Sequence, residues 1–237
     1  MTNTFSFAGE ETIEGIQKLI NCSDDTFIEI WSMQHEAAIK HLRTRGSLTG
    51  DPKFVFPPTE GNLGKRSAYQ WMQARMKDRL SEFQGELPIW GLLSRPQFSN
   101  KKDDKLLRLE IPKSRMLVSF HKPWNDLRGI MARLEGCESS WPNNWVSYCY
   151  PYIYVDEVDE VDGESRFIDG DQDQTNGARP QRSNWDESKC RSSWERMFNL
   201  SLAKQAQLLW GLRLQTMTPS ILSSDVRDEF SINYCPN

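Results

Sequence analysis

The chain has 237 residues, of which 38% are hydrophobic and 26% are charged, and its formal net charge is −4. This composition is typical of a soluble globular protein with one sizeable core, and no apolar run approaches the length of a membrane-spanning helix. The first residues lack the basic-then-apolar pattern of a secretory signal. We therefore expect a cytoplasmic protein without a membrane partner.

The cysteines are odd in number and scattered, with no C-x-x-C pair among Cys22, Cys137, Cys149, Cys190 and Cys235. This arrangement favours reduced thiols over a disulfide framework or a zinc cage.

The first half of the chain alternates strand and helix patterns. After a polar leader at residues 1–25, the β-branched and aromatic residues of 26–33 predict a buried strand, and 35–46 predict a helix that ends at Gly46. Residues 67–80 predict a second helix, because their apolar side chains recur on one helical face. A short strand is expected within 86–94.

The middle of the chain predicts two more strands and a helix. Residues 105–112 alternate apolar and charged side chains, and 115–120 continue as a strand after a Pro-Lys-Ser turn. Residues 124–136 carry an apolar stripe that is typical of a helix. Residues 145–155 then predict an extended segment with tyrosines on one face. A proline in this segment confines it to an edge or a bulge.

Acidic residues are concentrated in one segment. Residues 156–173 hold nine carboxylates and one arginine, a balance of −8, so we expect a mobile surface loop at about 156–184. A short helix at 192–200 and a closing strand at 208–217 complete the pattern. Together these elements predict a single α+β domain over 26–237, with a mainly antiparallel sheet, whole or split, flanked by three to four helices.

The pair His35-Glu36 opens the first helix and raises the question of a metal site. A zinc-binding H-E-x-x-H motif needs histidines four residues apart, whereas Ile39 stands at that position and His41 lies about 120° further around the helix than His35. We therefore expect no metal. Nucleotide-binding, hydrolase and kinase signatures are also missing from the sequence.

The nine tryptophans are unusual. Most buried tryptophans serve as core packing. An alternative hypothesis is that aromatic and polar side chains line a slot for a flat ligand such as a nucleobase or nicotinamide. The residues that we assign to this slot are Trp31, Gln34, Tyr69, Arg79 and Trp90.

Several strings stand out along the chain: "IWSMQ", "AIKHLRTRGSLTGDP", "AYQWMQARMKDR", "LPIWGLL", "LLRLEIPKSRMLVSF", "SWERMFNL" and "LLWGLRLQ". Their order resembles a bacterial and phage family, the domain of unknown function numbered three-eight-four-one. The resemblance runs collinearly from Phe27 to Met217 and implies a compact cytoplasmic domain, without an established activity. The positions that match the family's motif are Trp31, Gln34, Tyr69, Trp71, Met76, Arg79, Trp90, Trp194, Glu195 and Trp210. The chain departs from the family at Ser119-Phe120, Gly211 and Gln215.

Three functional hypotheses follow. The first is a binding or interaction protein without a cofactor, whose macromolecular partner belongs to the interplay of phage and host. The second rests on a looser likeness to ADP-ribosyltransferases, which implies NAD as the ligand and makes Glu195 and Gln215 the candidate catalytic residues. The third is nucleic-acid binding, although the chain outside the acidic segment has a balance of only +4.

Overall fold

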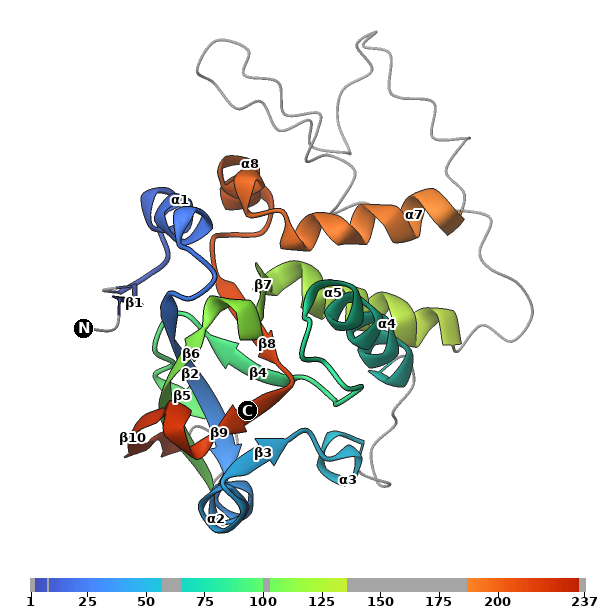
Figure 1. Cartoon of the computed structure of the whole chain (residues 1–237). Helices are drawn as coiled ribbons and strands as arrows, with labels where there is room; N and C mark the ends of the chain where they lie inside the picture. The colour runs from blue at the N-terminus through green and yellow to red at the C-terminus, as the bar shows by residue number, and fades with distance from the viewer. Residues whose placement is uncertain (1–2, 8, 57–64, 100–102, 136–186, 235–237) are drawn as a thin grey trace, which may run out of the picture.

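The computed structural model of the chain describes residues 3–7, 9–56, 65–99, 103–135 and 187–234 (Figure 1). A seven-stranded sheet forms its centre, with the strand order β10-β6-β2-β4-β8-β7 and with β1 paired to β2. All pairs in this sheet are antiparallel except the parallel pair of β1 with β2. The predicted α+β class with a mainly antiparallel sheet is therefore confirmed. The strands are β1 (Thr4–Phe5), β2 (Phe27–His35), β4 (Ile89–Leu92), β6 (Asp104–Pro112), β7 (Leu117–Phe120), β8 (Leu214–Thr218) and β10 (Val226–Ser231).

The pairing between β2 and β4 is the shortest in the sheet. Strand β2 pairs with β6 along its whole length, but its pairing with β4 is limited to Trp31 opposite Leu92. Strand β1 pairs with the beginning of β2 at Phe27 and Ile28. Two well-paired halves, β10-β6-β2 and β4-β8-β7, thus meet at a short junction.

Helices lie around the sheet, and two short strand pairs form separate two-stranded sheets (Figure 1). The helices are α1 (Ile13–Asn21), α2 (Glu36–Arg45), α3 (Pro52–Val55), α4 (Lys65–Arg79), α5 (His121–Glu135), α7 (Glu187–Ser193) and α8 (Ala203–Leu209). Short 3-10 turns are η1 (Lys113–Arg115), η3 (Trp194–Phe198), η4 (Leu200–Leu202) and η5 (Ser223–Asp225). The extra pairs are β3 (Ser47–Thr49) with β9 (Ser220–Leu222), and β5 (Phe98–Ser99) with β11 (Asn233–Tyr234).

The ends of α2 explain the His35-Glu36 pair. His35 is the N-cap of this helix, and its Nδ1 accepts a hydrogen bond of 3.1 Å from the amide of Ala37. At the other end, Gly46 has φ 78°, a left-handed conformation that glycine adopts without steric cost. His35 therefore serves as a helix cap in this fold.

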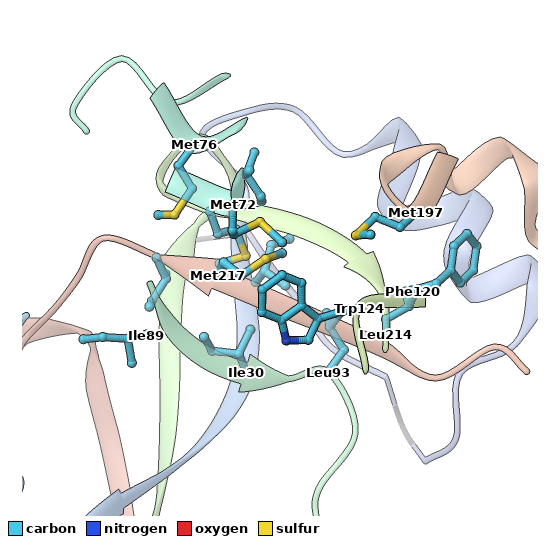
Figure 2. Packing of buried hydrophobic residues seen from close by; sticks show 14 of the residues in the cluster. Ile30, Met72, Met76, Ile89, Leu93, Phe120, Trp124, Met197, Leu214 and Met217 are labelled. Atoms are coloured by element: carbon cyan, nitrogen blue, oxygen red, sulfur yellow. The ribbon is translucent and has the colours of Figure 1, made fainter. Parts of the chain in front are cut away.

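The core lies between the sheet and the helices that cover it. Figure 2 shows Met72 and Met76 of α4 and Met217 of β8 in the same cluster as Trp124. These three methionines are fully buried, and Trp124 is nearly so. Flexible thioether side chains fill irregular spaces around a large aromatic ring, which suits a core formed by helices on a twisted sheet.

Two regions differ from the sequence-based expectation. The segment expected as a polar leader contains the helix α1, and Ile16 and Leu19 of this helix lie in the hydrophobic core. The expected strand at 208–217 begins only at Leu214, since Leu208 and Leu209 end α8 and Gly211 turns the chain with φ 74°. Strand β8 is also not a closing strand, because it lies inside the sheet between β4 and β7 and is followed by β9, β10 and β11.

Two predicted segments lie outside the described residues: the extended segment 145–155 and the acidic loop 156–184. Within the described part of the chain, no helix combines the length and apolar character needed to cross a membrane.

Candidate functional site

Tyr69 and Trp90, two of the residues predicted to bind a ligand, are in direct contact. The indole Nε1 of Trp90 donates a hydrogen bond of 3.0 Å to the hydroxyl of Tyr69. The Trp90 ring stacks on Trp124 of α5 with a centroid distance of 4.7 Å, and Tyr69 packs edge-on against both tryptophans. Burial raises the pKa of the Tyr69 hydroxyl, and the hydrogen bond from Trp90 and the charge of Arg128 oppose this effect only in part.

Gln34 joins the same cluster through Ser32. The side-chain amide of Gln34 donates to the Ser32 hydroxyl at 2.8 Å, and this hydroxyl donates to the main-chain carbonyl of Trp90 at 2.7 Å. Gln34, Tyr69 and Trp90 thus form one connected group, as the slot hypothesis requires. However, Tyr69 is only 8% exposed and its hydroxyl is engaged, so the contacts observed here are those of a packed junction between β2, β4 and the helices.

The hydrogen bond between Tyr69 and Trp90 gives a testable prediction. Replacing Tyr69 by phenylalanine leaves the partly buried Trp90 N–H without its acceptor, which is expected to lower the free energy of unfolding by about 1–3 kcal/mol. Urea denaturation of the single variants Tyr69→Phe and Trp90→Phe and of the double variant checks the coupling. If the two effects simply add, the hydrogen bond does not contribute to stability.

Trp31 belongs to a different group on the sheet. Its ring lies 5.8 Å from that of Phe230 on β10, and the guanidinium of Arg95 lies 5.2 Å from the Trp31 centroid and 4.8 Å from that of Phe230. Arg95 is exposed and both rings are half-buried. This cation–π cluster stabilises the surface of the β10-β6-β2 half through the attraction of a cation to aromatic rings.

Arg79 and Glu195 form the centre of a third group. The Glu195 carboxylate accepts from Arg79 at 2.6 Å and also forms an ion pair with Arg75. The Arg79 guanidinium lies 4.3 Å from the ring centroid of Phe198, and this ring stacks on Trp71. Because two guanidiniums already hold its oxygens, Glu195 is arranged as an ionic clamp between α4 and η3.

An open cavity of about 560 Å³ lies beside this clamp. The N-terminal helix α1 forms one side, the end of α4 and the η3-η4 segment form another, and η1 and β7 form the floor. Its lining includes Leu19, Arg79, Lys113, Val118, Glu195 and Phe198. The Lys113 ammonium donates to the carbonyls of Ile20 and Cys22 at 3.0 and 2.6 Å, which ties η1 to the end of α1. We call this cavity the β7 groove.

Gln215, the other catalytic candidate, is far from solvent. It lies in β8 with 3% exposure, and its side-chain amide donates to the Ser119 hydroxyl on β7 at 3.1 Å. Gln215 therefore joins two strands inside the sheet.

The predicted ligand residues are thus distributed over three places. Gln34, Tyr69 and Trp90 form one cluster, Trp31 another, and Arg79 lies in the β7 groove with Glu195. Sequence reasoning missed Phe198, Lys113 and the contribution of α1 to the groove. The first of these carried a signal, since Phe198 follows Trp194 and Glu195 at helical spacing in "SWERMFNL".

The described residues contain no group of three or more histidine, cysteine, aspartate or glutamate side chains that could hold a metal ion. The thiol of Cys22 is free and donates to the carbonyl of Lys18 at 3.3 Å.

Comparison with known proteins identifies the family of the chain. No curated protein and no solved structure gives a significant match. One family model, "Domain of unknown function (DUF3841)", matches residues 29–218, which is most of the chain and extends from β2 to the end of β8. The match includes the aromatic cluster and the Arg79–Glu195 clamp. The chain therefore belongs to the DUF3841 family.

Proposed function

We propose that this chain is a cytoplasmic binding protein that holds a segment of a partner protein in the β7 groove. The observation that carries the proposal is the groove itself, an open cavity of about 560 Å³ with both apolar and charged lining residues. Partly apolar concave surfaces with a few fixed polar groups are the usual places where proteins bind other molecules.

The state of the catalytic candidates favours binding over turnover. Glu195 is held by two arginines, and Gln215 is buried inside the sheet. A carboxylate that orients a ribose, as the ADP-ribosyltransferase alternative requires, needs an oxygen that is available to the substrate. We therefore propose no NAD or other cofactor for this chain.

The charges of the groove favour a protein partner over a nucleic acid. Its lining contains two basic side chains, Arg79 and Lys113, and two acidic ones, Asp24 and Glu195. A site for a phosphate backbone carries a clear excess of basic residues. The balanced groove instead suits a polypeptide segment without a large net charge.

The proposal is tested by selection from a displayed peptide library that tiles bacterial and phage proteins. The variant Leu200→Asp places a charge among the groove residues, whereas Leu208→Asp makes the same change on α8 at a side chain that is 40% exposed and does not line the groove. We expect Leu200→Asp to weaken binding of the selected peptides by about tenfold or more, or about 1.4 kcal/mol, and Leu208→Asp to leave it unchanged.

Two outcomes would contradict the proposal. Equal loss in both variants would place peptide binding outside the groove. A rise in melting temperature with NAD, accompanied by nicotinamide release, would favour the enzyme alternative instead.

A further inference from the structure

The helix α1 lies against the family domain but precedes the residues that the family model matches. The match begins at residue 29, whereas α1 spans Ile13–Asn21. Leu19 and Ile20 of this helix nevertheless line the β7 groove. One wall of the groove is therefore supplied by chain that lies outside the matched domain.

The chain between β1 and β2 leaves the sheet and returns to it at the same place. Strand β1 pairs in parallel with the beginning of β2, where Thr4 lies opposite Phe27. The amide of Phe27 also donates to the carbonyl of Asn3 at 3.0 Å. The two ends of the segment are thus held side by side, so the segment can detach from its seat without moving the strands that hold it. We call this segment, residues 6–26, the strap.

Lys113 fastens the strap at the C-terminal end of α1. Its ammonium donates to the carbonyls of Ile20 and Cys22 at 3.0 and 2.6 Å. The last carbonyls of a helix lack intrahelical donors and carry partial negative charge, so a cationic donor is favourable there. Beyond α1, the amide of Ser114 donates to the carbonyl of Asp24 at 3.0 Å. These contacts fix the end of α1 to η1, which lies within the matched residues and borders the groove.

Glu11 fastens the strap ahead of α1. One oxygen of its carboxylate accepts from the hydroxyl of Ser94 at 3.1 Å and from the amide of Leu214 at 3.2 Å. Leu214 is the first residue of β8, and Ser94 follows β4, so this contact joins the strap to the middle of the sheet. Hydrogen bonds to an ionised acceptor are stronger than those between neutral groups.

Between these two contacts, α1 is seated by apolar packing. Ile16 and Leu19 are fully buried, and α1 packs against η4 and α8, the second of which lies beside it in Figure 1. A helix of nine residues does not persist in water by itself, because its nucleation costs more than its few hydrogen bonds return. The helix is therefore formed while it is seated, and its packing and its hydrogen bonds are lost together when it leaves.

From these observations we propose that the strap opens as one unit while the sheet stays folded, with Glu11 and Lys113 as its two latches. Opening removes Leu19 and Ile20 from the lining of the groove, so the strap controls the shape of the groove and the access to it. The opening involves no ligand, whereas its effect on binding rests on the proposed function of the groove. A ligand that contacts α1 would hold the strap closed, since it would bind that state more tightly.

Hydrogen exchange of the unchanged protein at increasing urea concentrations, followed by mass spectrometry, tests the opening. Local opening exposes less surface than global unfolding does. We therefore expect the exchange of α1 amides to depend on urea less steeply than that of amides in β2 and β6. Equal slopes in the helix and the two strands would overturn the proposal, because α1 would then open only when the whole domain unfolds.

A variant of the first latch identifies its residue. Lys113→Met keeps the length of the side chain and removes the ammonium. We expect it to speed exchange in α1 by about tenfold or more, the effect of losing a hydrogen bond from a charged donor, and to leave β2 and β6 much less affected. The matched control is Lys122→Met, which removes an ammonium that pairs with Asp126 on α5 and should leave exchange in α1 unchanged.

The second latch has its own matched pair. Glu11→Ala removes the acceptor of two hydrogen bonds and should speed exchange in α1, whereas Glu10→Ala changes an exposed neighbour and should not. If Lys113→Met fails to fold, this pair and the urea slopes still decide. Unchanged α1 exchange in both latch variants would contradict the proposal. These measurements use no peptide, so their outcome is separate from the effect of Leu200→Asp on peptide binding, which tests the groove.

Discussion

Replacing Asp225 by alanine is expected to lower the free energy of unfolding by about 3–5 kcal/mol, because it leaves the largely buried Arg115, whose side chain is 14% exposed, without its counter-charge. Asp225 is 4% exposed. Its two carboxylate oxygens accept from Nη1 and Nη2 of Arg115 at 2.9 and 3.2 Å, and one of them also accepts from the amide of Leu222 at 2.8 Å. The pair connects η1, which borders the groove, to the turn before β10.

A matched aspartate on the surface provides the control. Asp228 forms an ion pair with Arg108 at 2.5 Å, but its side chain is 43% exposed. Exposed ion pairs contribute about 0–1 kcal/mol, so Asp228→Ala should change stability by no more than that. Urea denaturation, with the m-value monitored for changes in the unfolded state, measures both variants. Similar costs in the two variants would show that the buried pair has no special role.

Local patterns in the sequence predicted much of the fold. The alternation of β6 and the apolar face of α4 are periodic signals, and both elements lie close to the expected residues. The helix α1 was missed although a signal exists. Thr12 is its N-cap, with a side chain that accepts from the amide of Gly15, and Ile16 and Leu19 lie on one face. The many polar residues around them conceal a short amphipathic stripe.

The beginning of β8 could not be predicted for a different reason. The run "LLWGLRLQ" is mostly apolar, and a short apolar run of this kind suits a buried helix as well as a buried strand. In the structure both occur, because Leu209 ends α8 and Leu214 begins the strand after the turn at Gly211.

The site depends on tertiary arrangement to a greater extent than the fold elements do. Arg79 and Glu195 are separated by 116 positions, and no local pattern relates them. The groove likewise brings together α1, the end of α4, η1, β7 and the η3-η4 segment, which are distant in the sequence. The order of strands in a sheet follows from the packing of the whole chain, so composition and periodicity do not determine it.

Replacing Trp194 by alanine is expected to lower the free energy of unfolding by about 3–5 kcal/mol, because it removes a large, fully buried aromatic side chain from the core. Trp194 has 0% exposure and packs edge-on against Trp71 with a centroid distance of 6.0 Å. It begins η3, the segment that carries Glu195 and Phe198 into the groove. The same variant should therefore also weaken binding of the selected peptide.

The conservative variant separates packing from hydrogen bonding. The indole Nε1 of Trp194 is buried and has no hydrogen-bond acceptor among the described residues. Trp194→Phe keeps most of the ring volume and removes this unsatisfied donor. A buried donor without an acceptor lowers the free energy of unfolding by about 1–3 kcal/mol. We expect Trp194→Phe to retain more than half of the stability that Trp194→Ala loses, as measured by urea denaturation. An equal loss in the two variants would mean that the indole N–H is engaged in the folded protein.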